Sequence, residues 1–177
     1  MDRTRIRRNC LYRFFNEKEE VMTTKFPVLS YKTYDFRLKE EDGKLNIFDE
    51  LRKKWLVCTP EEWVRQNLIR FLIEEFGFPA NLIAIEKSLS LAGRNYRFDA
   101  LVYDRQFSPL MIIECKSPYV KLEQKVFDQI WTYNYEINAP FYLVTNGIAF
   151  IMGECRSGKT PSFFKEVKGF ENLIKEI

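Results

Sequence analysis

The chain contains no histidine among its 177 residues. This absence excludes Ser-His-Asp triads, general acid–base catalysis by imidazole and zinc sites with histidine ligands. Cysteine is scarce, and Cys10, Cys58, Cys115 and Cys155 lie far apart with no C-x-x-C pair. The spacing therefore indicates neither a zinc site nor a disulfide framework.

Long hydrophobic runs and a strong net charge are absent as well. No apolar run approaches the ~18 residues of a membrane-spanning helix, and the basic start 1–8 is not followed by the apolar segment of a signal peptide. We therefore expect a cytoplasmic protein of the bacterial type with no membrane partner. A net charge of +3 and a pI of about 8.6 permit a nucleic-acid partner without requiring one.

The composition is that of a folded domain, because 46% of the residues are hydrophobic and 16% are aromatic. We divide the chain into an N-terminal extension (1–24), a leading β element (25–58) and an α/β domain (59–177). The extension carries five arginines beside aromatic residues. A DNA-contacting arm and a frayed, disordered terminus both stay open for it.

Local patterns predict the elements of both parts. Segments 31–38 and 44–48 flank Asp42-Gly43 and predict a hairpin, with a third strand at 52–58. Thr59-Pro60 predicts the start of a helix that ends at Gly77. The remaining expected elements are a strand at 81–91 that turns at Gly93, an amphipathic helix at 121–138, strands at 141–145 and 148–153 joined by Asn146-Gly147, and a strand at 162–167.

Two apolar segments, 96–104 and 109–117, predict the central hairpin of the domain. A loop centred between residues 106 and 107 places Tyr103 opposite Leu110. Counting back in step then places Asp99 opposite Glu114, and the period of two puts Lys116 on the same face as Glu114.

Two opposed carboxylates in an apolar hairpin need an explanation, since like charges roughly 4.5–5.5 Å apart repel. Such a pair suits Mg²⁺, with Mn²⁺ as a substitute, and Lys116 is placed to hold or help deprotonate an attacking water. The alternative is a salt bridge between Asp99 and Lys116, with Glu114 near solvent.

Asp99 followed by Glu114-Cys115-Lys116 at the end of an apolar strand resembles the PD-(D/E)xK nuclease signature. More narrowly, segments 97–103 and 114–118 resemble the N-terminal nuclease domain of type I restriction enzyme R subunits in its short, stand-alone form, over about residues 54–154. The resemblance implies an α/β, restriction-endonuclease-like fold with a central mixed sheet flanked by helices. It also implies Mg²⁺-dependent hydrolysis of DNA, with the Cys115 carbonyl as a further metal ligand.

The resemblance also assigns supporting roles on the two helices. A glutamate of the first helix supports the metal site, and we favour Glu61, because Glu62 is expected to close a capping box with Thr59. That both acids simply favour the helix N-terminus is the alternative. Gln129 and Tyr133 match a Gln-x-x-x-Tyr element that acts close to the metal and the DNA; Gln124 is a weaker substitute, and a purely structural hydrogen bond of Gln129 stays open.

The expected DNA contacts are basic side chains around this site, Arg94, Arg97, Lys121 and Lys125, together with Tyr133. Arg94 and Arg97 are equally compatible with ordinary solvated charges. A homodimer and an assembly with partner subunits of a restriction system both stay open. The alternative function is a nuclease-like module that binds DNA or protein without cutting.

Residues 153–160 also fit the P-loop expression. A working P-loop needs a helix directly after it, whereas Pro161 follows here and 162–167 is predicted as a strand. We therefore interpret this segment as a hairpin turn and expect no nucleotide binding.

Overall fold

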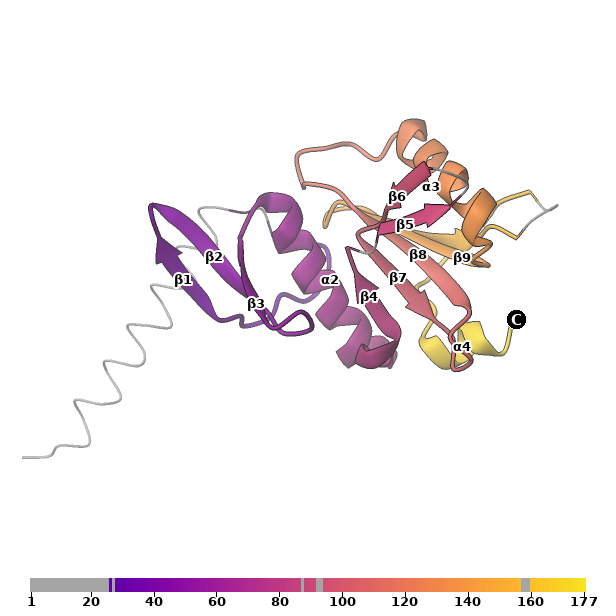
Figure 1. Ribbon diagram of the computed structural model, residues 1–177, viewed down its shortest axis with the longest axis horizontal. Helices are drawn as coiled ribbons and strands as arrows, with labels where there is room; N and C mark the ends of the chain where they lie inside the picture. Colours follow the sequence, from indigo (N-terminus) through magenta and orange to yellow (C-terminus); the bar gives the residue numbers. More distant parts are fainter. Residues whose placement is uncertain (1–25, 27, 87, 92–93, 157–159) are drawn as a thin grey trace, which may run out of the picture.

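A computed structural model describes residues 26, 28–86, 88–91, 94–156 and 160–177 (Figure 1). The N-terminal extension lies outside the described residues. The largest element is a six-stranded mixed sheet in the order β11-β10-β9-β8-β7-β4. Its strands are β4 (Ile83–Ile85), β7 (Ala100–Tyr103), β8 (Pro109–Cys115), β9 (Phe141–Thr145), β10 (Phe150–Glu154) and β11 (Ser162–Phe163). Only the β8–β9 pair is parallel within this described sheet.

The central hairpin forms with the expected offset over most of its length. Ala100 pairs with Ile113 and Val102 with Met111, and continuing this offset brings Asp99 level with Glu114. A bulge after Val102 shifts the last pair, so Tyr103 lies opposite Pro109 instead of the expected Leu110. The bulge sits at the turn end of the hairpin and therefore leaves the Glu114 end undisturbed.

The segment between β4 and β7 differs from the expected single strand at 81–91. A 3₁₀ turn (η1, Ala80–Leu82) leads into the short β4, and the chain then kinks at Glu86, whose φ is +49°. A separate two-stranded hairpin follows, β5 (Ser88–Leu91) and β6 (Arg94–Arg97). Glu86 N–H donates to the Asp99 carbonyl at 2.8 Å, so a backbone hydrogen bond ties this kink to Asp99.

The leading β element is a three-stranded antiparallel sheet of β1 (Leu38–Glu41), β2 (Lys44–Asp49) and β3 (Lys54–Val57). The turn at Asp42-Gly43 is confirmed, with φ values of +52° and +69°. The first strand begins at Leu38 and not at residue 31, because the preceding segment runs along helix α2. There Tyr34 N–H donates to Asn67 Oδ1, a bond to a side chain that replaces a strand ladder.

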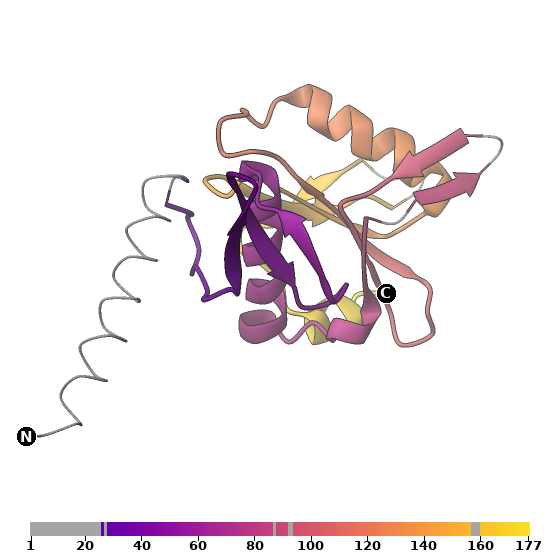
Figure 2. The ribbon, with the colours of Figure 1, turned by 60° about the vertical axis from the view of Figure 1, so that its left-hand side comes forward.

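Helix α2 (Pro60–Phe76) lies between the two sheets (Figure 1, Figure 2). Thr59 accepts from Glu62 N–H, and Gly77 ends the helix with φ +68°, as expected. The reciprocal half of the capping box does not form, since Thr59 N–H donates to the Val57 carbonyl. The Glu62 side chain is engaged elsewhere.

The six-stranded sheet is covered on both faces, which confirms the expected α/β class. One face packs on α2 and the short α4 (Phe170–Ile174), around residues such as Val102 and Met111. The other packs on α3 (Gln124–Ile137), around Ile112 and Val144. The small sheet shares the α2 core through Ile47, which is fully buried.

Gly153 is required where β10 meets β11. A Cβ there would lie 2.0 Å from the carbonyl oxygen of Ser162. Gly153 pairs antiparallel with Phe163, so the segment that fits the P-loop expression enters a strand pair and not a strand–helix unit; residues 157–159 between them lie outside the described residues. Within the described chain, no helix is both long and apolar enough to span a bilayer.

Candidate metal and phosphodiester site

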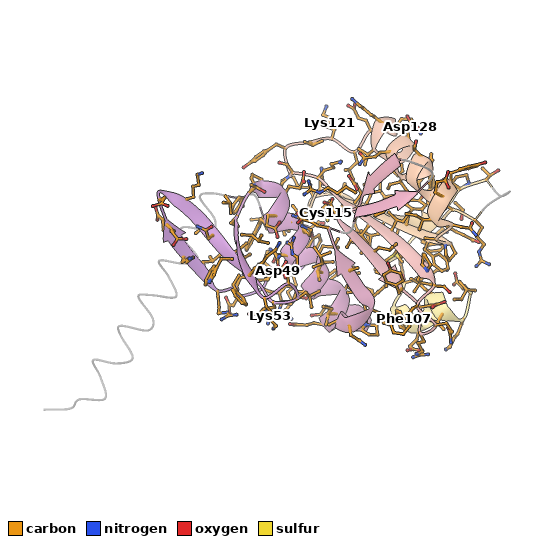
Figure 3. The ribbon with its side chains drawn as sticks, viewed as in Figure 1. Asp49, Lys53, Phe107, Cys115, Lys121 and Asp128 are labelled. Carbon is orange, nitrogen blue, oxygen red and sulfur yellow. The ribbon has the colours of Figure 1, made fainter. Side chains whose placement is uncertain are left out.

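The expected site residues meet at the C-terminal end of β8, beside the N-terminal half of α2. Figure 3 labels Cys115 there, in the middle of the molecule, whereas Phe107 marks the opposite end of the same hairpin. The loop that continues from β8 to α3 carries Lys121 (Figure 3). The site thus takes residues from the end of β8, the start of β7, α2 and α3.

Asp99 lies at the bend between β6 and β7, and both of its carboxylate oxygens are held. Oδ1 accepts from Arg65 Nη1 at 2.9 Å, and Oδ2 accepts from the Cys115 backbone N–H at 2.6 Å. Because the two donors come from different elements, they fix the plane of the carboxylate. The partner of Asp99 is thus Arg65, and not Lys116 as the salt-bridge alternative required.

Glu114 is more buried than Asp99, with only 5% of its side chain exposed. Its Oε1 accepts from Lys116 Nζ at 2.5 Å and from Gln129 Nε2 at 3.0 Å. Lys116 Nζ also lies 3.5 Å from Gln129 Oε1. Both bonds that Glu114 accepts from described residues fall on Oε1, which leaves Oε2 open to another ligand.

The acids of this site disfavour one another's charge. Burial, followed by the charge of Asp99, raises the pKa of Glu114 to about 7. Burial also raises the pKa of Asp99, against the opposing effects of the Cys115 N–H and Arg65. Glu61 follows the same pattern: burial and then Asp99 raise its pKa. The three carboxyl groups therefore lie within electrostatic reach of one another, as a cation site requires.

The pKa of Lys116 shows which form the amine takes. Burial alone would lower it, but the hydrogen bond and the charge of Glu114 outweigh burial and raise the pKa above its usual value. Lys116 is thus an ammonium in this arrangement. It can donate hydrogen bonds to a water or a phosphate oxygen, but it is not a free base.

An ionic network that was not predicted from the sequence contacts Asp99 through Arg65. Arg65 Nη2 contacts Glu62 Oε2 and lies 3.1 Å from Glu86 Oε1, and only 7% of the Arg65 side chain is exposed. Arg52 Nη1 contacts Glu86 Oε2 at 2.5 Å, and its Nη2 contacts Glu62 Oε1 at 3.1 Å. Asp49, fully buried beside α2 (Figure 3), accepts from Arg52 Nε at 2.5 Å. Glu62 therefore belongs to this network and not to a capping box.

Only some of the side chains expected to contact DNA lie among the described residues. Lys121 and Lys125 are exposed at the loop before α3 and in its first turn. Arg97 is 71% exposed and donates from Nη2 to Glu86 Oε1 at 3.1 Å, which ties it to the same network. The side chains of Arg94 and Tyr133 lie outside the described residues. Gln124 Nε2 donates to Asp128 Oδ1 at 3.0 Å, so it does not replace Gln129.

The residues present fit a divalent cation with few protein ligands. Within the described chain, no group of three His, Cys, Asp and Glu side chains is close enough to form a metal cage. Two carboxylates are nevertheless the usual protein share for Mg²⁺, which keeps waters and binds substrate phosphate. When all the carboxyl groups are ionised, the site and network carry two uncompensated negative charges. Six carboxylates then face four cations: Asp49, Glu61, Glu62, Glu86, Asp99 and Glu114 against Arg52, Arg65, Arg97 and Lys116.

A groove of about 240 Å³ lies elsewhere, between the segment before the small sheet, α2 and the C-terminal loop. Aromatic side chains such as Tyr31, Phe71 and Phe150 line it, and the site acids do not. The stacked pair of Tyr31 and Phe71 fills part of this surface, with ring centroids 5.1 Å apart. The groove is thus separate from the carboxylate site.

Three solved structures are among those similar to part of this chain. A fragment described as an HsdR subunit of a type I restriction enzyme from Vibrio vulnificus YJ016 is 18% identical with a TM-score of 0.48, over 63% of this chain and 24% of that one. The DrdV–DNA complex is 14% identical with a TM-score of 0.43, over 65% and 11%. A protein described as a DUF820 nuclease from Anabaena variabilis ATCC 29413 is 12% identical with a TM-score of 0.44, over 78% and 88%.

This chain thus spans about a quarter of the Vibrio fragment. No curated protein matches it. The family model described as "Type I restriction enzyme R protein N terminus (HSDR_N)" matches residues 60–170, more than half of the chain. The match includes α2, the central hairpin and α3, and with them Glu61, Asp99, Glu114, Lys116 and Gln129. The chain therefore belongs to the family of type I restriction enzyme R protein N termini, as its Asp99 and Glu114-Cys115-Lys116 segments predicted.

Proposed function

We propose that this protein hydrolyses DNA phosphodiester bonds with the help of Mg²⁺ held by Asp99 and Glu114. The observation that carries the proposal is the carboxyl pair itself. Glu114 is buried beside Asp99 with its pKa raised to about 7, a costly arrangement that a cation relieves. Family membership supports the nuclease class but leaves the reaction to the site.

The metal would bind through Oε2 of Glu114 and the carboxylate of Asp99, with Glu61 and the Cys115 carbonyl as nearby oxygen donors. Bound there, Mg²⁺ would stabilise negative charge on the phosphate and lower the pKa of its water. Lys116, kept as an ammonium by Glu114, donates hydrogen bonds that orient the attacking water and stabilise charge on the phosphate.

Gln129 has a positioning role in this proposal. Its amide donates to Glu114 Oε1 and lies 3.5 Å from Lys116 Nζ, so one side chain of α3 fixes the relation between the acid and the amine. Lys121 and Lys125, in the loop and first helical turn that follow β8, and Arg97, which contacts Glu86, are exposed and would contact phosphates of the DNA.

The test is incubation of the purified protein with supercoiled and linear DNA in Mg²⁺, Mn²⁺ or EDTA. We expect nicking or cutting with either metal and none in EDTA, and the Glu114→Gln variant should be inactive throughout. Glu136→Gln, an exposed change on α3, serves as the matched control and should cut like the wild type. DNA binding without metal-dependent cutting by the wild type would support the alternative, a non-catalytic binding module.

A further inference from the structure

We propose that Arg65 and Arg52 are positioning residues that set the carboxylate of Asp99 for metal binding. Arg52 acts from the leading sheet, outside residues 60–170 of the family match. The inference rests on the proposed function, because it names the residues that prepare the same metal site. It differs from a general role in folding, because it predicts a change in metal selectivity.

Asp99 occupies an unusual position. The residue stands at a bend and not inside a strand ladder, so the regular strand pairing does not fix its side chain. Two bonds fix it instead, one from Arg65 and one from the Cys115 N–H. Removing the Arg65 bond takes this donor away from Oδ1, and the carboxylate can then turn about its bond to the Cys115 N–H.

Arg65 is itself held in one orientation. Its Nη2 reaches both Glu62 and Glu86, while Nη1 reaches Asp99. Burial disfavours the charged guanidinium, but Glu62, Asp99 and Glu86 outweigh burial and raise the pKa of Arg65, so the charge persists. A lysine at this position has one point charge and cannot reproduce the planar fork that spans three carboxylates.

The small sheet contributes to the same network through Arg52. Arg52, in the turn after β2, bridges Glu62 and Glu86 through Oε1 and Oε2, the oxygens that Arg65 does not contact. Asp49 in turn orients Arg52, accepting from both its backbone N–H and its Nε. Burial would raise the pKa of Asp49, but these bonds and one from Gln66 outweigh burial and lower it, so the anion is stable. The leading sheet thus supports the site through Asp49 and Arg52.

Metal geometry turns this support into a measurable selectivity. Mg²⁺ demands near-ideal octahedral geometry, whereas Ca²⁺ accepts flexible and more numerous oxygen ligands. Removal of groups that orient a ligand typically weakens metal affinity by 10–100-fold. A loosened Asp99 should therefore weaken Mg²⁺ binding more than Ca²⁺ binding, whereas a general loss of folded protein would affect both ions alike.

The experiment compares Kd values for Mg²⁺ and Ca²⁺ by calorimetry for the wild type, Arg65→Lys, Arg52→Lys and the double variant Glu62→Gln/Arg65→Gln. All three variants keep the net charge of the wild type. The double variant removes an ion pair together, which avoids an uncompensated buried Glu62 and protects folding. Arg70→Lys is the matched control on α2, since Arg70 lies in a half-exposed pair with Glu74.

We expect the Mg²⁺ Kd of Arg65→Lys and of the double variant to rise about tenfold or more. The Ca²⁺ Kd should rise by no more than about threefold, because Ca²⁺ tolerates a displaced oxygen. Arg52→Lys should also raise the ratio of the Mg²⁺ Kd to the Ca²⁺ Kd, and Arg70→Lys should leave this ratio unchanged. If folded Arg65→Lys has the same ratio of Mg²⁺ Kd to Ca²⁺ Kd as the wild type, the inference is overturned and the proposed function stands. This holds whether both Kd values are unchanged or both rise equally. A wild type that binds neither ion overturns both.

Discussion

The substitution Glu114→Gln should stabilise the metal-free protein at high pH. The amide keeps the shape of the side chain and an oxygen that can accept from Gln129, but it removes the charge that burial and Asp99 disfavour. The folded-state pKa of Glu114 is raised from 4.5 to about 7, so the folded protein binds this proton more tightly than the unfolded chain. Stability of the wild type therefore falls as the pH rises from 4.5 through about 7.

The size of the effect follows from the size of the shift. At about 1.4 kcal/mol for each pKa unit, ionised Glu114 lowers the free energy of unfolding by up to roughly 3 kcal/mol above pH 7. The side chain is only 5% exposed, so solvent screening reduces this little. This shift already includes the opposing hydrogen bond and charge of Lys116. We therefore expect Glu114→Gln to gain about 1–3 kcal/mol at about pH 8, or roughly 3–10 °C in Tm.

Thermal unfolding in EDTA at about pH 4 and pH 8 measures this difference, with Glu136→Gln as the control. The gain should be present at the higher pH and nearly vanish at the lower one, where folded wild type and unfolded chain both carry the proton. Saturating Mg²⁺ should raise the Tm of the wild type but not of Glu114→Gln. If Glu114→Gln is no more stable than the wild type at pH 8, or if the gain does not depend on pH, the electrostatic reasoning is wrong.

Four further predictions follow from individual features. Lys116→Ala should retain metal and DNA binding, measured by calorimetry and gel shift, but lose cleavage, because the ammonium that orients the water is gone; retained cleavage contradicts its role. DNA affinity should fall with salt with a log–log slope of about −2 to −4, and a slope of zero would argue against phosphate contacts. Thr59→Ala should lower the free energy of unfolding by about 1 kcal/mol in denaturant titrations through loss of the α2 cap, whereas Thr132→Ala, exposed within α3, should cost less. Gly153→Ala should destabilise by about 1–3 kcal/mol, since its Cβ would collide with Ser162 O, and an unchanged midpoint would refute that close approach.

The central hairpin could be predicted from the sequence because strands alternate with a period of two. That period placed Glu114 and Lys116 on one face, and the loop centred between residues 106 and 107 gave the correct offset from Ala100 to Val102. The bulge at Tyr103 carries no such signal, because it depends on how the turn closes. The helix boundaries at Thr59 and Gly77 were equally predictable, since capping is local chemistry.

The ionic network was not predictable in the same way. Arg52 and Arg65 meet Glu86 across 34 and 21 positions of the chain, and no local pattern encodes such a pairing. One signal was available: Glu62 and Arg65 are three residues apart in a helix whose neighbouring residues are apolar. Because α2 is enclosed by two sheets, those charges are buried and must find partners. The capping-box assignment rested on the local spacing of Thr59 and Glu62, which carries no information about the sheets that enclose α2.

The central claim is that Asp99 and Glu114 hold one divalent cation. Anomalous diffraction from crystals soaked in Mn²⁺ tests it most directly, because it locates the ion without relying on activity. We predict a single strong peak between the two carboxylates, within about 2–2.5 Å of an oxygen of each, and no peak there in Glu114→Gln crystals. Wild-type crystals with no peak at this pair, at a Mn²⁺ concentration that supports DNA cleavage, would contradict the claim.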